Sequence, residues 1–399
     1  MSKKNVFAII TLAIFIVGII FITASTEPIE KDSDSEALAQ KLVNNCAGIK
    51  EGDLVVIVGG VRDVTLLEDI SVNVRRQGAF PLLTIGSDRL TTRIFNDVPV
   101  KFDSQVPKFN YELAQIIDAV ISVDYNESMD LLADVPPERF EVRNAASADI
   151  DNIIMDRNVR QVSLGNGLYP TTQRAEIFAL TLDELTDIFW NGVNVDYTLL
   201  NNKCNLLKNA LSSSKMMRIT NDNGTDFSVQ IEGRPIFISD GIISEDDLIT
   251  GGAACQVWLP AGEVYLTPVP GTAEGTIILE RQYYAGKEIL NLNLTFANGK
   301  LTNMTAESGL EPLMMMYDAA GAGKDQFAIV DLGVNPNVKI NPDSRLVAWM
   351  AEGMITICVG NDEWAGGSNE TSFFMANFLP GSTLTLDGET IIEKGSLKY

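Results

Sequence analysis

The stretch Asp53-Leu-Val-Val-Ile-Val-Gly-Gly60 decides the fold class of the first half of this chain. It is short, rich in β-branched residues and closed by glycines, which is typical of a strand buried on both faces in a parallel sheet. Apolar residues at helical spacing precede it at residues 36–46 and follow it at residues 64–76, where Gly78 ends the second helix. Alternation of helices and strands around a buried strand predicts an α/β layer.

The same alternation continues outward to about residue 205. Two more strands and three more helices are expected at residues 79–85, 119–123, 111–117, 183–190 and 197–211. We therefore predict an α/β domain with a parallel sheet over residues 36–205. Residues 206–399 show short alternating strands between hairpin signals such as Asn298-Gly299 and Asp387-Gly388, with one helix near residues 311–320. This half predicts a strand-rich α+β domain.

The N-terminal segment carries a long apolar run. Residues 6–24 are almost wholly apolar, and about 20 helical residues at ~1.5 Å each cross a hydrocarbon layer of ~30 Å. Because Lys3 and Lys4 precede this run, residues 1–25 are expected to form one transmembrane helix, a single-pass anchor in the cell membrane with a cytoplasmic N-terminus and an extracytoplasmic globular part. Residues 26–35 are predicted to be an acidic tether. The alternative is a secretory signal cleaved near Ala24, which would give a secreted protein.

Composition narrows the chemistry that is open to the chain. The net charge of −23 opposes binding to nucleic acid, and 46% hydrophobic residues are ample for a large core. The chain has no histidine, which excludes a Ser-His-Asp triad, a Cys-His dyad and a histidine-rich zinc site. The widely spaced cysteines form no CxxC motif and are expected to be buried thiols, with a disulfide left open: Cys46, Cys204, Cys255 and Cys358.

One segment carries a family resemblance. Residues 259–278 read LPAGEVYLTPVPGTAEGTII, and Gly333-Val-Asn-Pro336 follows downstream. In their order and spacing over residues 36–395, these landmarks and the opening run KEGDLVVIV resemble the aminopeptidase T family of metallo-aminopeptidases. The resemblance implies two divalent metal ions, such as zinc, cobalt or magnesium, held by carboxylates and imidazoles in the C-terminal domain. It also implies a homodimer.

The resemblance implies five metal-ligand positions, and this chain retains the family's ligand at one of them. Glu263, in the Gly-Glu-Val run, keeps the first ligand, whereas other residues stand at the remaining positions: Ile329, Thr356, Met375 and Asn377. Asp331 is a possible substitute for Ile329, although two residues along a strand displace it by ~6–7 Å. A single carboxylate with neutral oxygens suits zinc or cobalt poorly, so no metal cofactor is expected.

Three functions follow as hypotheses. The first is a membrane-anchored, extracytoplasmic pseudopeptidase that lacks hydrolysis and binds peptides or a partner. The second is an active metal-dependent aminopeptidase with a remodelled, oxygen-only site for Mg²⁺, Mn²⁺ or Ca²⁺, built from Glu263, Asp331, Glu274, Asp362 and Glu363. The third is a structural surface component, in which the old site is filled by Ile329, Met375, Trp364 and Phe374.

Overall fold

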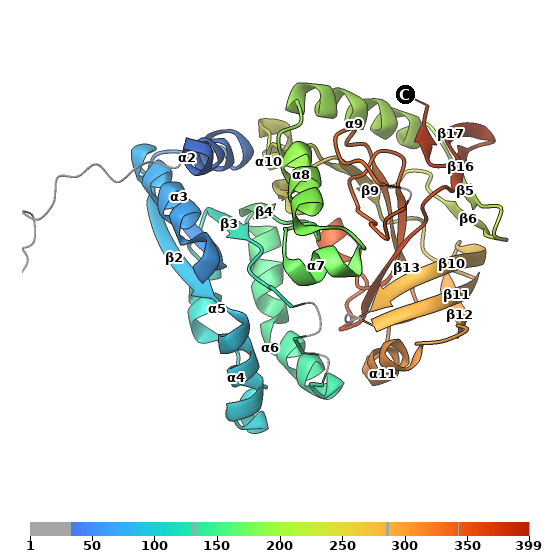
Figure 1. Cartoon of the computed structure of the whole chain (residues 1–399), viewed down its shortest axis with the longest axis horizontal. Helices are drawn as coiled ribbons and strands as arrows, with labels where there is room; N and C mark the ends of the chain where they lie inside the picture. The colour runs from blue at the N-terminus through green and yellow to red at the C-terminus, as the bar shows by residue number, and fades with distance from the viewer. Residues whose placement is uncertain (1–32, 129–130, 133, 285–286, 342, 399) are drawn as a thin grey trace, which may run out of the picture.

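A computed structural model describes residues 33–128, 131–132, 134–284, 287–341 and 343–398 of the chain (Figure 1). The predicted anchor at residues 6–24 and most of the predicted tether lie outside these residues. Within the described ranges, no helix is both long enough and apolar enough to span a membrane.

The first half of the chain builds a parallel five-stranded sheet with the strand order β2-β1-β3-β4-β8. Its strands are β1 (Leu54–Gly60), β2 (Phe80–Gly86), β3 (Ala119–Val123), β4 (Arg160–Leu164) and β8 (Gln256–Leu259). The helices of this half are α2 (Ser33–Gln40), α3 (Val64–Arg76), α4 (Asp88–Asp97), α5 (Lys108–Ala114), α6 (Pro137–Asp156), α7 (Thr172–Ile177), α8 (Leu182–Val193) and α9 (Tyr197–Ser212), and α10 (Glu245–Thr250) comes later in the chain, shortly before β8. The predicted α/β domain with a parallel sheet is confirmed.

The opening stretch forms the strand that its composition predicts. Val55 and Ile57 of β1 are buried, and α3 turns Leu67 and Ile70 inward, each fully buried. The α3 helix spans the predicted residues 64–76. A π-helical turn at Lys41–Cys46 continues α2, so the first predicted helix is present in two parts.

Strand β8 is a departure from the predicted arrangement. It lies beyond the predicted boundary at residue 205, yet it pairs in parallel with β4, with Val162 opposite Val257. The chain therefore enters the second half, returns to complete the parallel sheet, and leaves again. This return brings Trp258 and the residues after it to the junction between the two halves.

The second half contains two antiparallel sheets, in line with the predicted strand-rich domain (Figure 1). The larger has the order β12-β11-β10-β6-β5-β16-β17-β18, and the smaller has the order β15-β14-β13-β9-β7. Their bounds are β5 (Met216–Thr220), β6 (Asp226–Gln230), β7 (Ile236–Ser239), β9 (Glu263–Leu266), β10 (Glu274–Tyr284), β11 (Lys287–Ala297), β12 (Lys300–Thr305), β13 (Phe327–Gly333), β14 (Ile355–Gly360), β15 (Phe374–Phe378), β16 (Thr383–Leu386), β17 (Glu389–Glu393) and β18 (Ser396–Leu397). The predicted helix is α11 (Glu311–Ala319).

Two hairpins turn where the sequence predicts them. Asn298 and Gly299 join β11 to β12 with φ of 52° and 77°, and Asp387 and Gly388 join β16 to β17 with φ of 49° and 92°. Positive φ at both central residues is the conformation that Asn-Gly and Asp-Gly pairs favour, and its twist matches that of the flanking strands.

Candidate functional site

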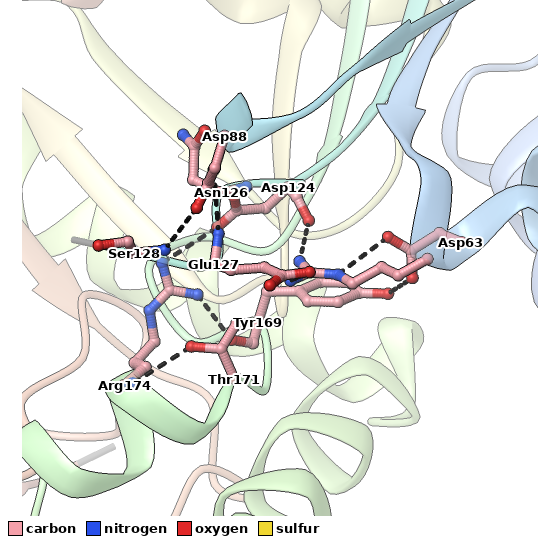
Figure 2. Close-up of polar contacts among 10 residues, drawn as sticks. Asp63, Asp88, Asp124, Asn126, Glu127, Ser128, Tyr169, Thr171 and Arg174 are labelled. Carbon is pink, nitrogen blue, oxygen red and sulfur yellow. Dashed lines mark hydrogen bonds and ion pairs between the residues drawn. The ribbon is translucent and has the colours of Figure 1, made fainter. Parts of the chain in front are cut away.

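The carboxyl edge of the parallel sheet, the usual ligand site of open α/β sheets, is closed by a polar network (Figure 2). Arg174 pairs with Asp124 at 3.2 Å and donates to the carbonyl of Tyr169 at 2.6 Å. The Tyr169 hydroxyl donates to Asp63 at 2.6 Å, and Arg62 donates to the carbonyl of Asp124 at 2.6 Å. These bonds tie together the segments that follow β1, β3 and β4.

Tyr125 fills the space above the glycines that end β1 and β2. A Cβ added at Gly60 would come within 2.8 Å of the Tyr125 side chain, and one at Gly86 within 2.5 Å. Glycine is therefore required at both strand ends so that this ring can pack there. The chain's own side chains occupy this edge. The family ligand that the sequence retains, Glu263, lies elsewhere, at the junction with the second half of the molecule.

Glu263 begins β9 at the junction of the two halves and is only 2% exposed. Its Oε1 accepts a hydrogen bond of 2.8 Å from Asn166 Nδ2, in the loop after β4. Asn335 fixes the segment before Glu263 by donating to the carbonyl of Ala261 at 2.6 Å, and a Cβ at Gly262 would come within 2.7 Å of it. The Gly-Glu-Val and Gly-Val-Asn-Pro landmarks are thus in direct contact.

Asp331 lies on the neighbouring strand β13 and lines the same cavity as Glu263. It pairs with Tyr265 of β9 on one side and with Thr356 of β14 on the other. Asp331 Oδ1 and Thr356 Oγ1 are buried and have no hydrogen-bond partner among the described residues. The sequence predicted that Asp331 is displaced along the strand from the ligand position at Ile329. This displacement does not take Asp331 away from Glu263, because β9 and β13 pair with Glu263 opposite Gly333.

Burial of the two carboxyl groups disfavours their charged forms. Loss of water raises the pKa of Glu263 to about 8, although the hydrogen bond from Asn166 opposes this. Burial, followed by the charge of Glu263, also raises the pKa of Asp331 well above its usual value. At neutral pH this pair of carboxyl groups is therefore at least partly protonated, whereas free carboxyl groups would be ionised.

Aromatic rings form the walls of the cavity, whose volume is about 280 Å³. Besides the two carboxyl groups, it is lined by Asn166, Gln256, Trp258, Trp349, Trp364 and Phe374. The centroids of Trp258 and Trp364 are 5.3 Å apart with an interplanar angle of 89°, and those of Trp364 and Phe374 are 6.1 Å apart at 74°. Trp364 thus makes edge-to-face contacts with both Trp258 and Phe374, and the buried ring of Tyr265 packs against Trp258 and Trp364.

The remaining positions of the ligand motif lie around or behind this cavity. Ile329 is fully buried beside Tyr265 and Cys358, two residues before Asp331 on β13. Side chains alternate along a strand, and Thr356 pairs with Phe378, so Asn377 lies on the opposite face of the sheet. There Asn377 accepts from Gln282 Nε2 at 3.3 Å.

Met375 likewise packs into the main core on that opposite face. Contrary to the ligand motif, Met375 and Asn377 do not face Glu263. The third hypothesis expected four apolar side chains to fill the old metal site. Two of them, Trp364 and Phe374, instead line a cavity.

The acidic residues proposed for a remodelled metal site do not converge. Glu274 is exposed at the start of β10 in the larger sheet, where it accepts from the backbone of Asn298 at 2.7 Å. Asp362 accepts from the backbone of Asn369 at 2.7 Å, and Glu363 lines a neighbouring cleft. Of these five acidic residues, Glu263 and Asp331 line the cavity and the other three do not.

The donors in this cavity do not fit the pair of metal ions that the family implies. They comprise two carboxyl groups, one of which is bonded to Asn166, the neutral side-chain amides of Asn166 and Gln256, and the Thr356 hydroxyl on the strand beside Asp331, and the chain has no imidazole. Among the described residues, no group of three or more histidine, cysteine, aspartate or glutamate side chains is placed to hold a metal ion. Two bound cations would need several more hard ligands than this.

A larger cleft of about 870 Å³ adjoins the cavity and shares Gln256, Trp364 and Phe374 with it. One wall is α6 of the first half, and the other is formed by the segments around residues 321–322 and 361–374. Among the described residues that line this cleft, none is basic and four are acidic: Glu141, Asp151, Glu363 and Glu370. An extended, negatively charged path thus leads to the two buried carboxyl groups.

Sequence reasoning missed several residues of this site. Asn166 follows β4 in a Gly-Asn-Gly turn, and Gln256 and Trp258 belong to the unexpected strand β8, so no motif marks them. Trp349 lies in a loop outside any strand or helix. The four cysteines are buried free thiols, as expected.

The fold matches solved structures of two proteins. AmpT from Thermus thermophilus superposes with a TM-score of 0.69 at 16% identity, over 92% of this chain and 99% of that one. The 2,5-dihydroxypyridine dioxygenase from Pseudomonas putida KT2440 superposes with a TM-score of 0.59 at 12% identity, over 93% of this chain and 98% of that one. At such identities the likeness establishes the fold alone. A search of curated proteins found no similar sequence.

The chain belongs to the thermophilic metalloprotease family (M29), whose sequence pattern matches residues 31–325. This confirms the resemblance to the aminopeptidase T family. The match includes Glu263 and ends before β13, β14 and β15. Asp331 and Thr356 therefore lie in a part of the chain that this pattern does not cover.

Proposed function

We propose that this protein is a peptide-binding member of the metalloprotease family that receives a cationic amino terminus and does not hydrolyse the peptide. The observation that carries the proposal is the buried pair Glu263 and Asp331 at the end of an acidic cleft, with a donor set that does not suit two metal ions. A cation placed between these groups supplies the charge and the donors that Asp331 Oδ1 lacks.

The shape of the site favours the end of a chain over its middle. The smaller cavity adjoins the larger cleft and is lined by rings, so it accepts one terminal group while the cleft holds the following residues. The absence of basic lining residues opposes a carboxyl terminus, whose charge these acids would repel.

Peptide binding without turnover is the first expected result. A peptide with a free amino terminus should bind, its N-acetylated copy should bind at least about ten-fold more weakly, and Glu263→Gln should remove most of this difference. Calorimetry measures binding, and bound metal and amino-acid release are measured after dialysis against Zn²⁺, Co²⁺, Mn²⁺ or Mg²⁺. Glu280→Gln, which removes an exposed charge outside the cavity, is the matched control.

Two outcomes would contradict the proposal. Near-stoichiometric metal with release of amino acids that stops on adding EDTA would establish an active peptidase with unusual ligands. Equal binding of free and acetylated peptides would show that the carboxyl pair does not receive the terminus.

We further propose that residues 6–24 anchor the protein in the cell membrane with the binding domain outside. Support comes from the length of the apolar run and from Lys3 and Lys4 before it. Full-length protein is expected in the membrane fraction, resistant to carbonate extraction, while protein beginning at residue 26 should be recovered in the aqueous fraction. Release of the full-length product with a new N-terminus near Ala24 would favour the cleaved signal instead.

A further inference from the structure

The cavity around Glu263 and Asp331 combines negative charge with aromatic walls. The carboxyl groups favour a ligand's positive charge, and the rings favour the apolar groups around that charge. Three of the four tryptophans in the chain line it, together with Phe374. All four of these residues are half-buried, and Trp364 and Phe374 also line the adjoining cleft. Ring faces attract cations through their quadrupole, most strongly in tryptophan.

A primary ammonium finds acceptors in this cavity only among the carboxyl and side-chain amide oxygens, because the aromatic walls offer none. It carries three N–H donors, whereas indole N–H groups only donate and phenylalanine has no polar atom. Of the carboxylate oxygens, Glu263 Oε1 already accepts from Asn166. A methylated ammonium needs no acceptor, and its methyl groups pack against ring faces.

We propose that the cavity selects a quaternary, N-methylated ammonium group over a primary ammonium. This rests on the proposed function, since it specifies the cation that the same cavity receives. The methyl groups contact the rings of Trp258, Trp364 and Phe374 that line the cavity, and Glu263 and Asp331 supply the opposite charge without having to form directed hydrogen bonds. A cavity of about 280 Å³ leaves room for a group of this size.

Selectivity is tested with tetramethylammonium and methylammonium chloride on the full chain in detergent, with potassium chloride at equal ionic strength as the blank. Quenching of intrinsic fluorescence reports binding, because most tryptophans line the cavity. Tetramethylammonium is expected to bind at least about ten-fold more tightly than methylammonium. Two peptides that differ only in N-terminal trimethylation then separate a peptide ligand from a free quaternary ion such as choline.

Variants identify the rings that contribute. Trp364→Leu is expected to weaken tetramethylammonium binding by about ten-fold, whereas Trp364→Phe keeps a ring and should lose only about two- to three-fold. Trp190→Phe, at a tryptophan that packs on Phe189 away from the cavity, should leave binding unchanged. Thermal melts of all variants separate lost binding from lost folding.

The outcomes distinguish the failure of this selectivity from the failure of the proposed peptide-binding function. Methylammonium binding as tightly as tetramethylammonium, or equal binding of the two peptides, overturns the selectivity and leaves the peptide-binding function standing. If neither ion and neither peptide binds to a folded protein, both are overturned. Loss of tetramethylammonium binding in a folded Trp190→Phe would show that the ion binds outside this cavity, which also overturns the inference.

Discussion

Replacing Glu263 by glutamine is expected to stabilise the ligand-free protein above about pH 7 and to change it little near pH 5. Burial raises the pKa of Glu263 from the ordinary 4.5 to about 8, so between these values the folded state holds a proton that the unfolded state has released. Stability therefore falls as pH rises, by about 1.4 kcal/mol per pH unit over this window. Glutamine does not titrate and can still accept from Asn166.

The expected difference at about pH 8 is several kcal/mol, or roughly 5 °C in melting temperature for a chain of this size. Melting temperatures of wild type, Glu263→Gln and Glu280→Gln across this range provide the measurement. The melting temperatures of wild type and of the exposed control Glu280→Gln should fall in parallel as pH rises, whereas the melting temperature of Glu263→Gln should depend less on pH. Asp331→Asn should act in the same direction, since the pKa of Asp331 is also raised. Parallel profiles for all the proteins would contradict the buried, protonated state.

Replacing Arg174 by alanine is expected to destabilise the protein by about 3 kcal/mol or more. Arg174 is 6% exposed, pairs with Asp124 and donates to the carbonyl of Tyr169 in the network of Figure 2. Its removal leaves the mostly covered carboxylate of Asp124 without this partner and opens the packing at the edge of the parallel sheet. Chemical unfolding followed by circular dichroism measures the change.

A matched control is available in the second half of the chain. Arg218 and Asp226 form a bidentate pair at 2.8 Å whose side chains are 56% and 60% exposed, so Arg218→Ala should change stability little or not at all. Adding Asp124→Asn to Arg174→Ala should recover part of the loss, because the buried charge is then removed. Equal effects at the buried and the exposed arginine would contradict this account of the network.

Local sequence signals predicted the elements that are long, periodic and contiguous. The β-branched run before Gly60, the helix at residues 64–76 and the strand at residues 119–123 appear as predicted. Helix α6 escaped prediction because just two of its residues, Arg139 and Ile150, are buried, so it carries little apolar periodicity. Strand β8 escaped because four residues give almost no pattern, and its partner β4 lies far back in the sequence.

The site was predictable only where a motif marked it. Glu263 stood in a recognisable run, whereas the importance of Asp331 depends on how β13 pairs with β9, which no local pattern reveals. Strand pairing also places Met375 and Asn377 on the far face of the sheet. The cavity's aromatic walls come from three separate segments, so their convergence is a property of the tertiary structure.

The late arrival of β8 has a consequence for synthesis on the ribosome. About 95 residues separate the end of β4 from the end of β8, which corresponds to roughly 5–20 s of elongation. During this interval the edge of β4 remains unpaired, and unpaired strand edges are templates for pairing with other chains. The parallel sheet of the first half therefore cannot be completed until β8 has been synthesised, well after residue 205. A fragment ending at residue 205 should consequently be prone to aggregate rather than fold as a unit.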